Sequence, residues 1–163
     1  MSKMKFYVDA MFGNLSRFLR VLGYDCLLRP NTQNTSDFFY KAKEENRIII
    51  TRSRVLYYQA CKREISSIFI NKEGIVNILC DLRRKIKIKL ICDPNNSRCS
   101  ECNGLLVKIE KKLIRNEVNN GTFEHFEEFW KCKSCGKIYW EGSHWIDIRR
   151  KVKEVEECVK NEN

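Results

Sequence analysis

The sequence lacks the long apolar segments and targeting signals of proteins that enter or cross a membrane. No apolar run approaches the roughly 20 residues of a membrane span. Residues 1–8 are too few and too polar for a signal peptide, because Asp9 follows Phe6-Tyr7-Val8 at once. No internal repeat or low-complexity tract is visible. We therefore expect a cytoplasmic protein with no membrane partner.

Disulfide bonds are also not expected, since the cytoplasm keeps thiols reduced. The nine cysteines should then be free thiols or metal ligands. Some are scattered singly, and we interpret these as small buried or incidental residues: Cys26, Cys61, Cys80, Cys92 and Cys158. The others form two C-x2-C pairs, Cys99 with Cys102 and Cys132 with Cys135.

The two cysteine pairs predict a structural zinc site. Two thiolates on a tight turn can bind one ion, and two such turns complete a tetrahedral shell. A catalytic zinc would need an open coordination position and a base. His125 and His144 are alternative ligands, but four thiolates already fill the shell. We expect His144 to be packed between Trp140 and Trp145, or hydrogen-bonded there.

The charge of the chain indicates a polyanionic partner. The net charge is +10, and 32% of the residues are charged. Such an excess favours nucleic acid first and a membrane surface second, whereas the alternative is that the lysines only maintain solubility. Basic residues alternate with apolar ones near Arg83–Lys89, a run that could follow an RNA backbone.

The first part of the chain has the pattern of an α/β domain. Short apolar segments predict strands at 5–8, 24–28, 47–51 and 65–70. Amphipathic spacing and capping residues, with Thr35 or Ser36 as one cap, predict helices at 12–22, from 35 or 36 to about 46, at 55–61 and at 74–84. Residues 85–89 are either a fifth strand or an exposed connector. This alternation predicts a parallel sheet flanked by helices, with ligands at the carboxyl ends of the strands.

A turn-rich segment at 93–97 divides the chain into two expected domains, 1–92 and 93–163. The second would be a small four-cysteine zinc ribbon with strands near 105–109, 129–131 and 137–140. A charged helix from about 145 to 158 would follow as a tail.

Several segments together resemble one known family. These are residues 6–25, the stretch Ile50-Thr51-Arg52-Ser53-Arg54, residues 99–104, and residues 124–145 with their closing Tyr-Trp-x-Gly-Ser-His-Trp. They resemble the Mut-seven C-terminal RNase domains, in which a PIN-like nuclease domain is fused to a zinc ribbon. The resemblance spans residues 4 to about 147.

The resemblance implies a metal-dependent endoribonuclease. In PIN-type sites, acids at the strand ends hold Mg²⁺ or Mn²⁺, and the metal activates water against a phosphodiester. By position, Asp9 is the first acid, Asp37 is the second, and Ser53 stands where the family has a third. Serine is a weak neutral ligand, so this replacement lowers metal affinity. Asn14 stands where the family usually has arginine.

Each of these residues also has a structural interpretation. Asp9 follows an apolar strand, where burying a charge is costly unless the charge is paired or serves a function. Asp37 lies in the first turn of a helix, where the helix dipole alone would favour an acid. Four arginines are either phosphate contacts or solvated surface residues: Arg17, Arg20, Arg52 and Arg54.

Two functions follow from this reasoning. One is a Mg- or Mn-dependent endoribonuclease, or a degenerate form of one, acting on structured RNA. The other is a catalytically inactive RNA-binding protein on the same scaffold, associated with ribosomal RNA or a ribosomal subunit. Neither implies a preference for DNA. A protein-interaction module is a third possibility, against which the basic charge argues.

Overall fold

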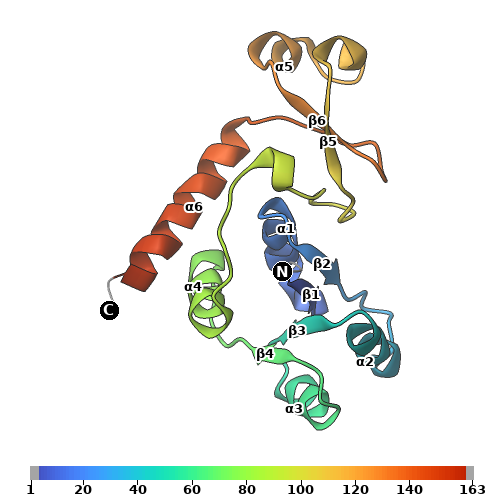
Figure 1. Ribbon diagram of the computed structural model, residues 1–163, viewed down its shortest axis with the longest axis vertical. Coiled ribbons are helices and arrows are strands. Elements are labelled where there is room, and N and C mark those ends of the chain that lie inside the picture. Colours follow the sequence, from blue (N-terminus) through green and yellow to red (C-terminus); the bar gives the residue numbers. More distant parts are fainter. Residues whose placement is uncertain (1–3, 161–163) are drawn as a thin grey trace.

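The first half of the chain forms a parallel sheet of four strands in the order β2-β1-β3-β4 (Figure 1). The computed structural model describes residues 4–160. The strands are β1 (Lys5–Val8), β2 (Asp25–Leu28), β3 (Arg47–Thr51) and β4 (Ser67–Phe69). A 3₁₀ turn (Ala10–Phe12) precedes α1 (Gly13–Val21), and the other helices are α2 (Thr35–Glu44), α3 (Arg54–Lys62) and α4 (Ile75–Ile86). The predicted α/β class is confirmed.

Both faces of the sheet are covered, as the apolar strands require. Successive side chains of a strand point to opposite faces. Accordingly, Phe6 and Val8 of β1 join one buried cluster, with side chains of α1 and α4, whereas Tyr7 joins another with Phe38 and Phe39 of α2. The carboxyl ends of the strands therefore open at one edge of a sheet that is buried on both sides.

Two local expectations need correction. The side chain that caps α2 is Asn34, which accepts a hydrogen bond from the Asp37 N–H at 2.8 Å, and not Thr35 or Ser36. The segment after α4 is a connector rather than a fifth strand. Lys87 ends α4 in a left-handed conformation, and Ile88 is buried rather than exposed, because it packs into the core beside α1 and α4.

The ribbon is an antiparallel sheet of β5 (Leu106–Ile109), β6 (Phe129–Cys132) and β7 (Ile138–Tyr139). A 3₁₀ turn (Pro94–Asn96) precedes it, and an insert between β5 and β6 contains a second 3₁₀ turn (Lys111–Ile114) and α5 (Asn120–His125). Phe129 and Trp130 fill its small core, and the Trp130 indole N–H donates to Asn95 Oδ1 at 3.0 Å.

After the ribbon, α6 (Ser143–Lys160) returns to the α/β domain and runs beside α4 (Figure 1). Ile148, Val152 and Val155 of α6 belong to the same buried cluster as Ile78 and Leu82 of α4. The predicted division near residue 92 stays a prediction, but this helix completes the core of the first part. Within residues 4–160, no helix is both long and apolar enough to cross a membrane.

A buried arginine joins the ribbon to the α/β domain. Arg20 of α1 is only 7% exposed. Its Nε donates to the carbonyl oxygen of Cys26 at 2.8 Å, and its Nη1 donates to those of Ser100 and Glu101 at 2.8 and 2.9 Å. A buried guanidinium needs such acceptors, because it has no other means of replacing its lost hydration.

Asn103, one residue after the first cysteine pair, makes the second contact of this junction. It adopts a left-handed conformation (φ 67°) that turns the chain toward β2. Its side chain accepts from the Cys26 N–H at 3.1 Å and donates to Asp25 Oδ1 at 2.8 Å. Arg47 binds the same carboxylate through two nitrogens. Burial alone would raise the pKa of Asp25, but the hydrogen bonds from Arg47 and Asn103 lower it.

Replacing Arg20 with leucine should destabilise the protein by about 2–4 kcal/mol, because three carbonyl groups lose their buried donor. Urea denaturation would measure this change in the free energy of unfolding. Arg17→Leu is the matched control on the same helix, since Arg17 is 61% exposed and makes one ion pair at 3.5 Å. It should cost less than about 1 kcal/mol. Equal effects of the two substitutions would contradict the role assigned to Arg20.

Candidate metal centre and strand-end site

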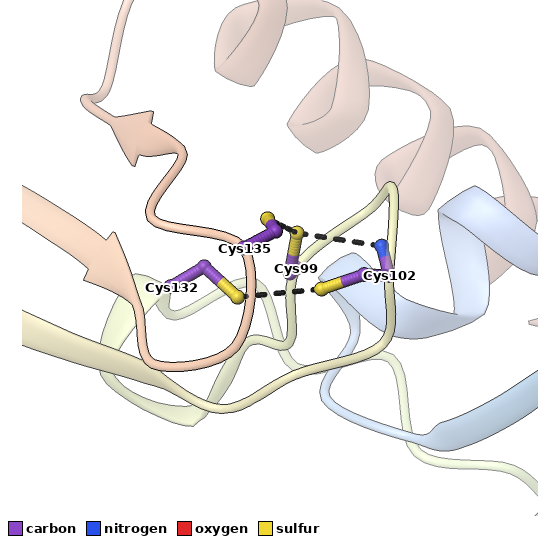
Figure 2. Close-up of side chains that lie close together, drawn as sticks. All are labelled: Cys99, Cys102, Cys132 and Cys135. Atoms are coloured by element: carbon purple, nitrogen blue, oxygen red, sulfur yellow. Dashed lines mark hydrogen bonds between the residues drawn. The ribbon is translucent and has the colours of Figure 1, made fainter.

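The four cysteines of the two pairs meet at one point of the ribbon (Figure 2). Cys99 and Cys102 come from the loop before β5, Cys132 ends β6, and Cys135 lies in the turn that follows. All four Sγ atoms lie within 4.8 Å of one another. The Sγ atoms of Cys99 and Cys135 are 3.6 Å apart, and those of Cys102 and Cys132 are 3.4 Å apart.

These distances suit a tetrahedral zinc ion. A Zn–S bond of about 2.3 Å places two sulfur ligands about 3.8 Å apart in a tetrahedron. Cys99 and Cys132 are buried and Cys102 and Cys135 are exposed, so the cluster lies at the surface of the ribbon. The cluster could therefore bind a metal such as zinc, and it would do so without a free coordination position.

Local hydrogen bonds favour the thiolate form of one of the four ligands, Cys99. Burial alone would raise the pKa of the Cys99 thiol, but the Tyr139 hydroxyl, 2.9 Å from Cys99 Sγ, and the N–H groups of Glu101 and Cys102 lower it to about 6. Tyr139 thus supports a metal ligand from the neighbouring strand β7. Tyr139 was evident from the sequence as an aromatic residue, but its hydrogen bond with Cys99 could not be predicted.

Neither histidine belongs to the cluster. His125 is exposed, and its Nδ1 lies 2.9 Å from the carbonyl oxygen of Gly121. His144 is also exposed, so the expectation that it is packed between Trp140 and Trp145 is wrong. The reason is that α6 begins at Ser143, and its first turn buries Trp145 while directing His144 outward.

A second group of polar side chains lies at the carboxyl ends of β1 and β3. Asp9 follows β1, and its carboxylate accepts from the N–H of Ala10 at 2.9 Å and from Thr51 Oγ1 at 3.0 Å. Arg29 Nη1 lies 3.8 Å from Asp9 Oδ1, and both side chains are largely buried. The Asp9 charge is thereby partly balanced within the protein.

Thr51 links Asp9 to Ser53. Its hydroxyl oxygen accepts from the Ser53 N–H at 3.0 Å while it donates to Asp9. The Ser53 side chain caps α3 by accepting from the Leu56 N–H at 3.3 Å. Asp37, by contrast, is exposed in the first turn of α2. Its carboxylate accepts from Asn34 Nδ2 at 2.7 Å, and its backbone N–H donates to Asn34 Oδ1 at 2.8 Å.

Sequence reasoning missed Thr51 and Arg29. Thr51 lies in the same short signature as Ser53, and Arg29 directly follows β2. Strands β2, β1 and β3 are neighbours in the sheet, so residues just beyond their carboxyl ends lie close together. The strand order needed for this inference was not available from the sequence.

The four predicted RNA-binding arginines have different surroundings. Arg17 and Arg54 are exposed, and the Arg54 guanidinium lies 5.5 Å from the ring centre of Phe69. Arg52 is partly exposed and donates to the Lys72 carbonyl at 2.6 Å. Arg20 is the buried residue of the junction, so its donors face carbonyl groups instead of solvent.

The strand-end residues do not form the acidic cluster expected for Mg²⁺ or Mn²⁺. Among residues 4–160, the four cysteines are the only group of three or more His, Cys, Asp or Glu side chains close enough to share an ion. Hard cations prefer several oxygen ligands with negative charge. Here one largely buried carboxylate contacts an arginine and one threonine hydroxyl, so this donor set fits such a cation poorly.

Together, the parallel four-strand α/β sheet and the ribbon with four clustered cysteines define a two-part α/β protein with a candidate metal centre. The family model of the Mut7-C RNAse domain matches residues 4–152. The chain therefore belongs to the Mut7-C RNAse domain family, and the suspected membership is confirmed. A search of curated proteins finds no match to this sequence. The family supports a nuclease-like function related to RNA.

The zinc assignment predicts that Gly104→Ala weakens metal binding. A Cβ atom at Gly104 would lie 2.7 Å from Cys132 Sγ and 2.6 Å from Ser134 Oγ, so the ligand must move. We expect about one zinc per chain in the parent protein, and a loss to chelator about tenfold faster in the variant. Elemental analysis and a chelator-competition time course would measure both.

Gly121→Ala is the matched control, since its nearest contact would be an ordinary 3.6 Å from Asn119 Oδ1. It should retain zinc like the parent protein. A parent protein that purifies without metal and keeps a stable ribbon would disprove the zinc assignment.

Proposed function

We propose that this protein binds RNA through its PIN-like domain and its ribbon, and that its strand-end nuclease site is degenerate. The observation that carries the proposal is the surroundings of Asp9. Its carboxylate contacts Thr51 and Arg29, and Thr51 in turn accepts from the Ser53 N–H. Within residues 4–160, no group of acids close enough to share an ion lies there. Arginine balances one carboxylate but cannot activate water as a bound metal does.

RNA binding is supported by charge and by the exposed cations. The net charge of +10 favours a polyanion. Arg17 and Arg54 are exposed and Arg52 is partly exposed, and guanidinium groups suit the geometry of phosphate. The proposed partner is structured RNA, such as ribosomal RNA or a ribosomal subunit, in the cytoplasm.

An active endoribonuclease is the second candidate, and the retention of Asp9 favours it. Thr51 holds the Asp9 carboxylate in a fixed orientation at the strand ends. Asp9 would then be the main ligand of Mg²⁺ or Mn²⁺, which would supply an activated water when bound. Asp37 would have to release Asn34 before it could join Asp9 as a ligand.

The proposal predicts that the parent protein binds labelled RNA without cleaving it in Mn²⁺, and that Ser53→Asp increases Mn²⁺ affinity. Aspartate also caps helices well, so α3 should stay intact while a second carboxylate is added. Calorimetric titration would measure Mn²⁺ binding, and gel analysis of structured and single-stranded RNA would measure cleavage.

Ser53→Asn is the matched control, because asparagine caps a helix without adding charge. It should bind Mn²⁺ no better than the parent protein. Cleavage by the parent protein that disappears in EDTA and in Asp9→Asn would instead establish the active enzyme. Failure to bind any RNA at low salt would contradict both candidates.

A further inference from the structure

A groove of about 560 Å³ lies where α1 meets the ribbon, apart from the strand-end site and the cysteine sulfur atoms. Its walls come from α1, from the loop of the first cysteine pair, and from the segment that joins β7 to α6. The side chains that matter for its chemistry are Asn14, Arg17, Glu101, Lys137, Trp140 and His144.

Two cations flank this groove. Arg17 Nη2 lies 3.5 Å from Glu101 Oε2, and Lys137 Nζ lies 3.2 Å from Glu101 Oε1. Arg17 and Lys137 remain 61% and 48% exposed, so both can also contact a ligand from solvent. One carboxylate between two cations leaves the lining with an excess positive charge, which suits a phosphate backbone.

An aromatic side chain stands beside the cations. Trp140 is half-buried, and it is held in place by Phe126 and Phe129, whose ring centres lie 6.3 and 6.4 Å from its own. A Cβ atom at Gly142 would lie 3.0 Å from the Trp140 Nε1, so the glycine lets the indole lie against the backbone. A tryptophan fixed by packing loses little entropy when a base stacks on it.

A second cavity adjoins the groove at Asn14. This smaller cavity of about 270 Å³ is lined by Met11, Phe12, Asn14 and Arg52, among others. Met11 and Phe12 follow Asp9 closely, and Arg52 follows β3. Asn14 lines both this cavity and the larger groove, so the two hollows lie on either side of the same residue.

We propose that the groove binds a single-stranded segment of RNA, with a base stacked on Trp140 and phosphates on Arg17 and Lys137. This proposal rests on the proposed RNA-binding function and specifies the kind of RNA that reaches the ribbon. Structured RNA supplies such segments in its loops and ends, where bases are free to stack on aromatic side chains. The Glu101 carboxylate offers an acceptor for a ribose hydroxyl or a base amino group.

The test uses the full chain with bound zinc and a fluorescent oligouridylate of twelve residues, which has no stable structure. Fluorescence anisotropy at several salt concentrations gives the affinity and its salt dependence. The double substitution of Arg17→Ala with Lys137→Ala should weaken binding at least several-fold. It should also reduce the slope of log affinity against log salt by about 0.7 for each lost phosphate contact.

Trp140→Leu should weaken binding roughly 5- to 100-fold and leave that slope unchanged, because stacking releases no counterions. Zinc content and the circular dichroism spectrum must match the parent protein for this variant to count. If Trp140→Leu loses its fold, the double cation variant decides alone, since both of its side chains are exposed.

Lys108→Ala is the matched control, because Lys108 is also an exposed ribbon lysine in an ion pair, with Glu128, but lies outside the groove. It should bind almost like the parent protein. Parent-like affinity of both groove variants, or weakening by Lys108→Ala equal to that by Lys137→Ala, would overturn the groove proposal. Binding of an RNA hairpin without binding of oligouridylate would overturn it too, while leaving the proposed function intact. Binding of neither RNA would contradict both the groove proposal and the proposed RNA-binding function.

Discussion

The position of the ribbon depends on one buried guanidinium. Arg20 belongs to α1, yet two of its acceptors are the carbonyl groups of Ser100 and Glu101, which lie between the first two cysteines. A buried arginine without these acceptors would be costly, so the fold of the α/β domain and the path of this loop are coupled. The same contact places Glu101 beside α1, where it forms one wall of the groove. The metal centre, the domain junction and the groove therefore share a single structural support.

A bound metal ion would stabilise the ribbon side of this junction. The two cysteine pairs come from segments about thirty residues apart, and only a common ion would join their thiolates firmly. Zinc binding would order the loop that carries Ser100, Glu101 and Asn103, and these residues contact α1 and β2. Because α6 then packs against α4, the ribbon is held at both of its ends. Through these contacts, loss of a bound metal would also destabilise the α/β domain.

The sequence predicted those features that depend on neighbours along the chain. The strand at Lys5–Val8 was found with its correct bounds, because a short apolar run that ends at an acid leaves little choice. The cysteine cluster followed from spacing alone, and the capping of α2 was misplaced by one or two residues among several polar candidates. The surroundings of Arg20 could not be predicted. Arg17 and Arg20 occupy similar positions on the same helix, yet Arg17 is exposed, and two of the acceptors of Arg20 lie some eighty residues away in the sequence. Arg29 was missed for the same physical reason, because strand order alone brings it to Asp9.

The surroundings of Ser53 and Asp9 are compatible with the proposed loss of an acid. Ser53 caps α3 with a hydrogen bond, so an exchange of aspartate for serine there would cost the helix little. Asp9 would then be left as a buried charge, but Thr51 and Arg29 compensate it. The Arg29 contact is 3.8 Å, an ion pair longer than a hydrogen bond, so it balances charge without fixing geometry. The hydrogen bond from Thr51 instead fixes the orientation of the Asp9 carboxylate. Under the proposed function, Asp9 would keep an orientation suited to a metal ligand while Arg29 balances its charge, which is why adding one carboxylate at Ser53 is the decisive test.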